Sequence, residues 1–320
     1  MRLPATILIS CVTVMEADWA SCQVYPNKPI RVLTSSTGSG GDFVARLIAQ
    51  GLRNSLGQQL VIEIDNRGGN LPAEVVAKSP PDGYTLLITG TNTWIQPLMQ
   101  DSATYSYDVE RDFAPVTSAV WLPCILAVHP SLPVKSVKNL ISLAKTHPGG
   151  LNFAYAQRGA APHLAAELFK SLAGVKMQGV SHSNTTFALT SLLSGELQVA
   201  FPAAGAVAPH LKSGRLRILA LTSAEPSALF PGLPTIAATL PGYESVSVTA
   251  IFAPAKTPLT IIARLNQEIV TVLNQSDIKD QFAHAGISVV GSSPEQLAEK
   301  VKSETVRMGK VIRDAGLRTQ

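Results

Sequence analysis

Short apolar runs and longer amphipathic stretches alternate along this chain from about residue 28 onwards. Residues 30–35 form the first apolar run. Residues 42–56 form the first amphipathic stretch, in which apolar side chains recur every three or four positions. Asp42 is suited to cap the start of this helix, and Gly57 is suited to end it. Runs of strand length between stretches of helix length are typical of α/β proteins, so the sequence predicts an α/β fold.

The alternation also predicts two lobes, with two crossings of the chain between them. The crossings are expected near residues 121–128 and 245–252. They divide the chain into one lobe of residues 25–123 plus 249–320 and a second lobe of residues 124–248. Strands are expected at residues 30–35, 61–64, 84–89, 125–129, 152–156, 175–180, 198–201, 216–221 and 287–290, and helices at 42–56, 162–172, 185–194, 205–213, 258–274, 277–285 and 294–315.

The first 22 residues have the features of an export signal. Arg2 gives a positively charged start, residues 3–15 are mostly apolar, and small residues surround a cleavage point near Cys22. The apolar run is too short to span a bilayer. We expect removal of residues 1–22, with a lipid on Cys22 as the alternative because Ala20-Ser21-Cys22 resembles the end of a bacterial lipobox.

Composition and charge narrow the class of protein. Apolar residues make up 46% of the 320 residues and charged residues 15%, which is typical of a folded globular chain. The net charge is +4, and the basic residues are scattered, so a nucleic-acid surface is not expected. A mildly positive protein favours anionic small molecules.

Cysteine usage excludes a disulfide framework. Of the three cysteines only Cys124 lies well inside the expected mature chain, so neither an intramolecular disulfide nor a multi-cysteine metal site can form there. Its neighbours are apolar, which indicates a packed residue rather than a nucleophile.

A glycine-rich turn, residues 37–42 (TGSGGD), joins the first expected strand to the first expected helix. Backbone N–H groups at such a helix start attract anions. The turn is not a dinucleotide fingerprint, because Phe43 stands in place of the third glycine, and no Gly-Lys-Ser/Thr follows for a phosphate loop. A tight turn without ligand contact is the alternative. The expected ligand contacts here are Ser36, Gly38, Ser39, Gly40, Gly41 and Asp42.

Two further polar loops also connect a strand to a helix, at residues 157–163 and 181–186. Arg158 is suited to bind a carboxylate through two hydrogen bonds. His163 either contacts the ligand or has a structural role, and the polar residues after 181 either contact the ligand or cap their helix. The expected contacts in these loops are Arg158, Gly159, Ala160, Ala161, His163, Ser183, Asn184 and Thr185.

Motifs of catalysis and metal binding are absent from the sequence. It lacks a G-x-S-x-G elbow, an H-E-x-x-H helix, an EF-hand loop and a C-x-x-C pair, and its histidines are isolated. We therefore expect a non-catalytic protein without a cofactor. A hydrolase or isomerase that uses His163 or Asp42 as a base is the alternative.

Several phrases in a fixed order resemble one family, the Bug/TctC receptors of bacterial tripartite tricarboxylate transport. They are YPNKPI at residues 25–30, GSGGD followed by VARL at 38–47, PPDGYTL at 80–86, DFAPV at 112–116 and PGYE at 241–244. The resemblance implies a periplasmic, type II-like binding protein of Venus-flytrap form, with two lobes joined by two crossing strands. It further implies a monomer whose ligand is a small carboxylate, gripped in the cleft by loops that fall on residues 36–42 and 157–163.

Some residues depart from the family pattern. Gly41 stands where the family usually has Thr, the second loop is shortened around Arg158, and Pro202 stands where an Asp is common. The fold is therefore expected to hold, while the identity of the acid and the retention of binding stay open. The expected partner of the loaded receptor is a set of membrane transporter subunits, with a sensor kinase as the alternative.

Overall fold

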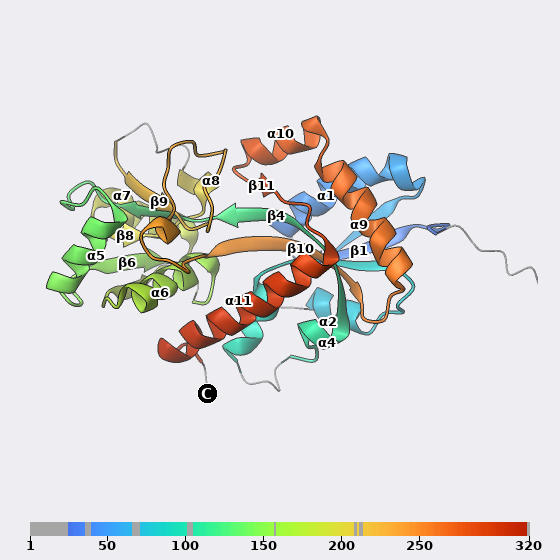
Figure 1. Cartoon of the computed structure of the whole chain (residues 1–320), viewed down its shortest axis with the longest axis horizontal. Coiled ribbons are helices and arrows are strands. Elements are labelled where there is room, and N and C mark those ends of the chain that lie inside the picture. The colour runs from blue at the N-terminus through green and yellow to red at the C-terminus, as the bar shows by residue number, and fades with distance from the viewer. Residues whose placement is uncertain are drawn as a thin grey trace, which may run out of the picture.

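Two β-sheets lie toward opposite ends of the protein in a computed structural model, which describes residues 25–35, 40–65, 71–100, 105–156, 158–207, 210 and 214–318 (Figure 1). Two long strands, β4 (Phe113–Pro123) and β10 (Val246–Pro254), pair antiparallel and extend from the first sheet toward the second. This arrangement confirms the predicted two-lobed α/β fold with two crossing strands. The expected export signal lies outside the described residues.

The first sheet has the strand order β11-β4-β10-β3-β1-β2. Its other strands are β1 (Ile30–Ser35), β2 (Leu60–Asp65), β3 (Thr85–Gly90) and β11 (Ser288–Val289). Strand β3 is buried on both faces: Leu86 and Ile88 pack with α1 (Gly40–Leu56) and α9 (Leu259–Leu273), while Leu87 packs in the cluster that contains α2 (Leu71–Ala77) and α11 (Pro294–Asp314). Such double burial explains why the consecutive residues 86–88 of β3 are all apolar.

The second sheet has the strand order β7-β6-β8-β5-β9. These strands are β5 (Ile125–Val128), β6 (Asn152–Tyr155), β7 (Gln178–Ser181), β8 (Val199–Ala200) and β9 (Arg217–Leu221). Strand β6 is parallel to both β7 and β8, so the carboxyl ends of these three strands meet at one edge. The helices of this lobe are α5 (Val137–Thr146), α6 (Ala161–Ala173), α7 (Thr185–Ser194) and α8 (Ala204–Val207).

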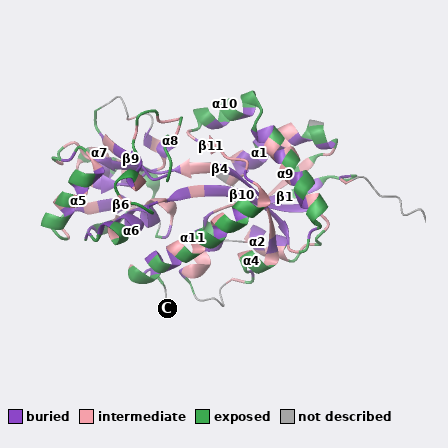
Figure 2. Cartoon of the chain, viewed as in Figure 1, coloured by how far each residue is buried: buried purple, intermediate pink, exposed green. Residues whose placement is uncertain are grey.

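Helix α11 connects the two ends of the molecule. It starts with a capping box between Ser293 and Gln296, runs along β4 and packs against α6 of the second lobe (Figure 1). Figure 2 shows buried and exposed residues alternating along it, as expected for a helix with one face on the core. The remaining elements are α3 (Asn92–Ile95), η1 (Gln96–Leu98), α4 (Val109–Asp112), η4 (Ile236–Ala238) and α10 (Ser276–His284).

The start of α1 and the start of β7 differ from the expectations. Helix α1 begins at Gly40, so Asp42 lies in its first turn and is not the cap that the sequence predicted. The strand expected at 175–180 begins at Gln178. Of the helix expected at residues 205–213, the structure describes the start as α8, and residues 208–209 and 211–213 lie outside the described residues.

Cys124 is buried and free, as expected of a packed residue, and burial raises the pKa of its thiol to about 12. Within the ranges given above, none of the helices combines the length and hydropathy needed to cross a membrane.

Candidate ligand-binding site

A cavity of about 270 Å³ lies at the carboxyl ends of β6, β7 and β8. In sheets of this kind, ligands bind at that edge because the strand-to-helix loops there expose backbone groups. The predicted contacts Ala160, Ser183, Asn184 and Thr185 all line it. The full described lining is Ala154, Tyr155, Ala156, Ala160, Pro162, Ser183, Asn184, Thr185, Ala188, Leu189, Ala200 and Pro202.

The helix α6 begins at this cavity without a side-chain cap. Its N-cap residue is Ala160, which has extended backbone angles and no side-chain acceptor for the first N–H groups. Pro162 carries no N–H, which leaves the N–H groups of Ala161 and His163 as the donors of the first turn. An uncapped helix start favours an anion both by its hydrogen-bond donors and by the positive end of the helix dipole.

The helix α7 begins at the same cavity but is capped. The Oδ1 atom of Asn184 accepts a hydrogen bond from the Phe187 N–H at 3.0 Å, so the structure shows the capping role that the sequence left open for this residue. The neighbouring Ser183 and Thr185 also line the cavity. The N-cap side chain therefore accepts a hydrogen bond from the first turn of α7. The first turn of α6 has no such acceptor.

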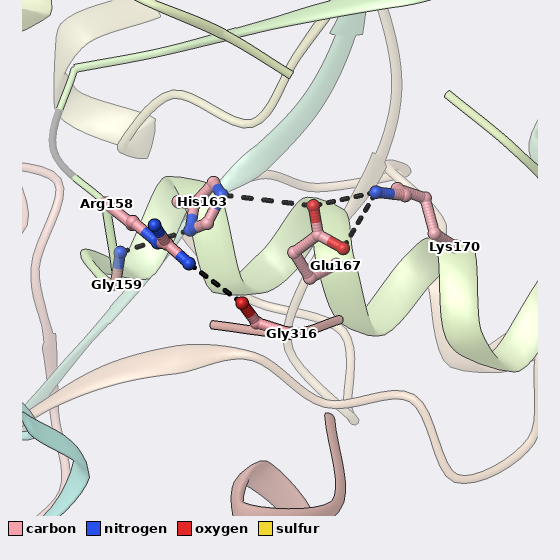
Figure 3. Close-up of polar contacts among 6 residues, drawn as sticks. All are labelled: Arg158, Gly159, His163, Glu167, Lys170 and Gly316. Carbon is pink, nitrogen blue, oxygen red and sulfur yellow. Dashed lines mark hydrogen bonds and ion pairs between the residues drawn. The ribbon is translucent and has the colours of Figure 1, made fainter. Parts of the chain in front are cut away.

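His163 is buried beneath the loop and is not part of the described cavity lining. Its Nδ1 accepts the Gly159 N–H at 3.1 Å (Figure 3). Its ring packs on Tyr155 with centroids 4.2 Å apart. Burial, with the nearby charges of Lys170 and Arg158, lowers the pKa of His163 to about 4. The ring is thus neutral at pH 7, with its proton on Nε2, and it holds the loop between β6 and α6 in place.

Arg158 has a partner different from the predicted ligand carboxylate. Its Nη2 donates to the backbone oxygen of Gly316 at 2.9 Å, and the side chain is exposed (Figure 3). Gly316 follows the end of α11, where the helix dipole favours a cation. The close packing of α11 on α6 brings this carbonyl within reach of the arginine.

Gly159 adopts a positive φ of 79°, and a Cβ there would collide with the side chain of Met99. The positive φ therefore favours glycine at this position, and a larger residue would also have to displace the end of the Met99 side chain.

The first predicted loop is only partly described. Ser36, Gly38 and Ser39 lie outside the described residues, while Gly40 and Gly41 are the first two residues of α1. Asp42 is buried, and one of its carboxylate oxygens lies 2.7 Å from Nε of Arg46. A carboxylate in the first turn of a helix is stabilised by the helix dipole, so this pair fixes the start of α1.

The sequence reasoning missed the apolar part of the cavity. Ala154 and Tyr155 end β6, Ala200 ends β8, and Ala188 and Leu189 lie on α7. Their position at the carboxyl ends of adjacent parallel strands was the available signal, but the pairing of β6 with β8 could not be read from the sequence. Among the residues that the structure describes, no group of three His, Cys, Asp or Glu side chains could hold a metal ion.

Known proteins resemble this chain over nearly all of its length. Residues 44–317 match the family model described as tripartite tricarboxylate transporter family receptor. The protein BugT of Bordetella pertussis is 32% identical over 320 residues, which cover 98% of each chain. The structure of Rpa4515 of R. palustris with adipate is 34% identical with a TM-score of 0.71, covering 91% of this chain and 98% of that one. MatC from Rhodopseudomonas palustris with bound malate is 29% identical with a TM-score of 0.68, covering 90% of this chain and 100% of that one.

Proposed function

The chain belongs to the tripartite tricarboxylate transporter family receptors, which are periplasmic solute-binding proteins and not enzymes, and from this premise we propose that it captures a small organic acid between its two lobes for delivery to a membrane transporter. The acids bound by two relatives, adipate and malate, support the carboxylate class.

The observation that carries the proposal is the uncapped start of α6 at the cavity. The ligand carboxylate accepts hydrogen bonds from the N–H groups of Ala161 and His163, and the hydroxyls of Ser183 and Thr185 lie to its side. An anion there satisfies donors that the helix leaves open and interacts with the positive end of its dipole.

The opposite side of the ligand is held by the loop before α1. Ser36, Gly38, Ser39, Gly40 and Gly41 supply backbone amides and hydroxyls from the first lobe. Asp42 and Arg158 act at longer range in this proposal: Asp42 fixes the first turn of α1 with Arg46, and Arg158 adds positive charge near the loop.

The two lobes consist of residues 25–123 plus 249–320 and residues 124–248. Cys124, the single residue between β4 and β5, supports the first boundary, because the chain leaves one sheet at Pro123 and enters the other at Ile125. A ligand that contacts both lobes stabilises the closed arrangement by its higher affinity for that state. The closed receptor is then the form that the transporter recognises.

Replacing Ala160 with aspartate tests the proposal. The new carboxylate occupies the position of the bound anion, caps α6 and repels an acid. Because an N-cap aspartate stabilises a helix by about 1 kcal/mol, we expect Ala160→Asp to unfold at an equal or higher temperature while losing acid binding.

The measurement is a thermal-shift screen of the mature protein against mono-, di- and tricarboxylates, followed by calorimetry of the acids that raise the melting temperature. Ala160→Ser serves as the matched control, since it caps the helix without adding charge and should bind more weakly than wild type but more tightly than Ala160→Asp. Wild-type affinity in Ala160→Asp would remove the α6 start from the site, and a wild-type protein that binds no acid would refute the receptor proposal.

A further inference from the structure

The end of α11 presents a backbone oxygen whose direction is fixed. Gly316 adopts a positive φ of 61°, and the N–H of the next residue, Leu317, donates to the Ile312 oxygen at 2.9 Å. This is the pattern of a Schellman helix end, in which a glycine follows the helix and the apolar residue after it packs inwards. Because Leu317 is buried, the Gly316 oxygen is held in one direction, and Arg158 donates to it at 2.9 Å.

Two segments of the first lobe together form the surface on which the turn before α6 lies. Nε of Arg318 donates to the Leu98 oxygen at 3.3 Å, which joins the chain after α11 to the end of η1. The next residue, Met99, is buried, and its sulfur lies so close to Gly159 that a Cβ on this glycine would collide with it. The turn at residues 158–160 therefore contacts the first lobe twice, through the Arg158 side chain and through the backbone of Gly159.

The same turn is also bonded to the helix that follows it. The Gly159 N–H donates to Nδ1 of His163, in the first turn of α6, at 3.1 Å (Figure 3). In the proposed function, the N–H groups of Ala161 and His163 bind the carboxylate of the acid. Gly159 thus links the first-lobe surface to these donors, and a turn that left this surface would displace them.

We propose that Arg158 is a positioning residue for acid binding. Its hydrogen bond to Gly316 holds the turn on the first lobe, so that the N–H groups of Ala161 and His163 are in place before the acid arrives. The inference rests on the proposed function and gives Arg158 a role other than direct contact with the acid. One exposed hydrogen bond contributes a factor of about five to an equilibrium constant. The apparent affinity falls with the fraction of molecules whose site is in place.

Stopped-flow measurement of the association and dissociation rate constants separates positioning from direct contact. Adipate and malate, the acids bound to two relatives, are the probes, and the acid with the largest thermal shift is used if neither binds. We expect Arg158→Ala to lower the association rate constant about fivefold and to leave the dissociation rate constant unchanged, because only molecules with the turn in place bind the acid. A guanidinium that contacts the bound acid predicts faster dissociation, and this result would overturn the inference.

Salt concentration separates positioning from attraction through space. A guanidinium that only attracts the acid loses most of this effect between about 0.05 M and about 0.5 M NaCl, because salt screens exposed charges. Salt affects a hydrogen bond to an uncharged carbonyl much less. The ratio of the wild-type association rate constant to that of Arg158→Ala should therefore stay near five, and a ratio that falls to one at the higher concentration would overturn the inference.

Lys145→Ala is the matched control, since it removes an exposed positive charge from α5 of the same lobe. It should have the wild-type rate constants at the higher salt concentration. Wild-type rate constants in Arg158→Ala as well would overturn the inference and leave the receptor proposal standing. A wild-type protein that binds no acid would refute the receptor proposal itself.

Discussion

The carboxylate of Glu304 accepts a hydrogen bond from the indole Nε1 of Trp94 at 3.1 Å, inside the core and 210 residues away along the chain. This contact ties α11 to α3. Glu304 is almost completely buried, and burial raises its pKa above the ordinary value of 4.5, more than Lys300 and Trp94 lower it.

Glu304→Gln should flatten the dependence of stability on pH. Between 4.5 and the raised pKa, the folded wild type holds a proton that the unfolded chain has released, so its stability falls as the pH rises through this window. Glutamine keeps an acceptor for Trp94 and does not ionise. Urea unfolding at several pH values measures the free energy of unfolding, and its value for the variant should increase relative to that of the wild type as the pH rises. Glu299→Gln, on the exposed face of the same helix, should follow the wild type throughout.

His163→Asn should lose less stability than wild type when the pH falls from 7 to 4. Between the folded pKa near 4 and the ordinary value of 6.5, the unfolded chain binds a proton that the folded chain does not, so wild type loses about 3 kcal/mol from this residue as pH falls from 7 to 4. The asparagine side chain can accept the Gly159 N–H but does not titrate. The variant should therefore lose less stability than wild type over this interval, whereas the exposed His147→Asn should lose as much. Parallel curves for His163→Asn and wild type would contradict the assignment of the buried neutral ring.

Glu244→Gln should destabilise the protein by about 2 kcal/mol at pH 7. Burial alone would raise the pKa of Glu244, but the charges and hydrogen bonds of Lys300 and Arg307 hold it below its usual range. Its carboxylate lies 2.8 Å from Lys300 and 3.3 Å from Arg307, and loss of one partner leaves partly buried cations uncompensated. Asp314→Asn breaks the exposed pair with Lys310 and should cost no more than about 0.5 kcal/mol. Equal effects in denaturant unfolding would show that the Glu244 cluster adds nothing beyond a surface ion pair.

Gly205→Val should weaken acid binding by about tenfold through its effect on the closed arrangement. A Cβ at Gly205 of α8 would lie 3.1 Å from the backbone oxygen of Ala285, and a Cβ at Gly286 would lie 3.3 Å from the Gly205 Cα. This close contact joins α8, in the second lobe, to the segment after α10, in the first lobe, so a larger side chain at Gly205 would push the two segments apart. Calorimetry would measure the affinity, and small-angle scattering with and without acid would report closure. Ala206→Val, one position along α8, should leave both unchanged, and a Gly205→Val protein that binds and closes normally would rule out this contact as a determinant of closure.

Local sequence patterns predicted the regular elements of the fold well. The strand at residues 30–35 and the helix at 185–194 have the expected bounds, because their apolar spacing and helix-start signals agree. Strand β4 was missed over most of its length, since burial on both faces removes the alternation that identifies a strand and Pro115 interrupts the run.

The candidate site was predictable where it depends on loop position and not where it depends on packing between distant segments. Ala160 and residues 183–185 follow strand ends, which was visible in the sequence. The burial of His163 depends on Tyr155, and the position of Arg158 depends on Gly316, 158 residues away. Neither contact leaves a periodic pattern in the sequence.

The central place of β10 in the first sheet has a consequence for the order of folding. This strand lies between β3 and β4, yet it follows all five strands of the second sheet in the chain and is synthesised after them. A chain that emerges from its amino end must therefore keep the facing edges of β3 and β4 unpaired with each other until residue 246 arrives. The second sheet has all its strands by then and can fold first, so its assembly brings the two ends of a long loop together and lowers the entropic cost of inserting the last central strand.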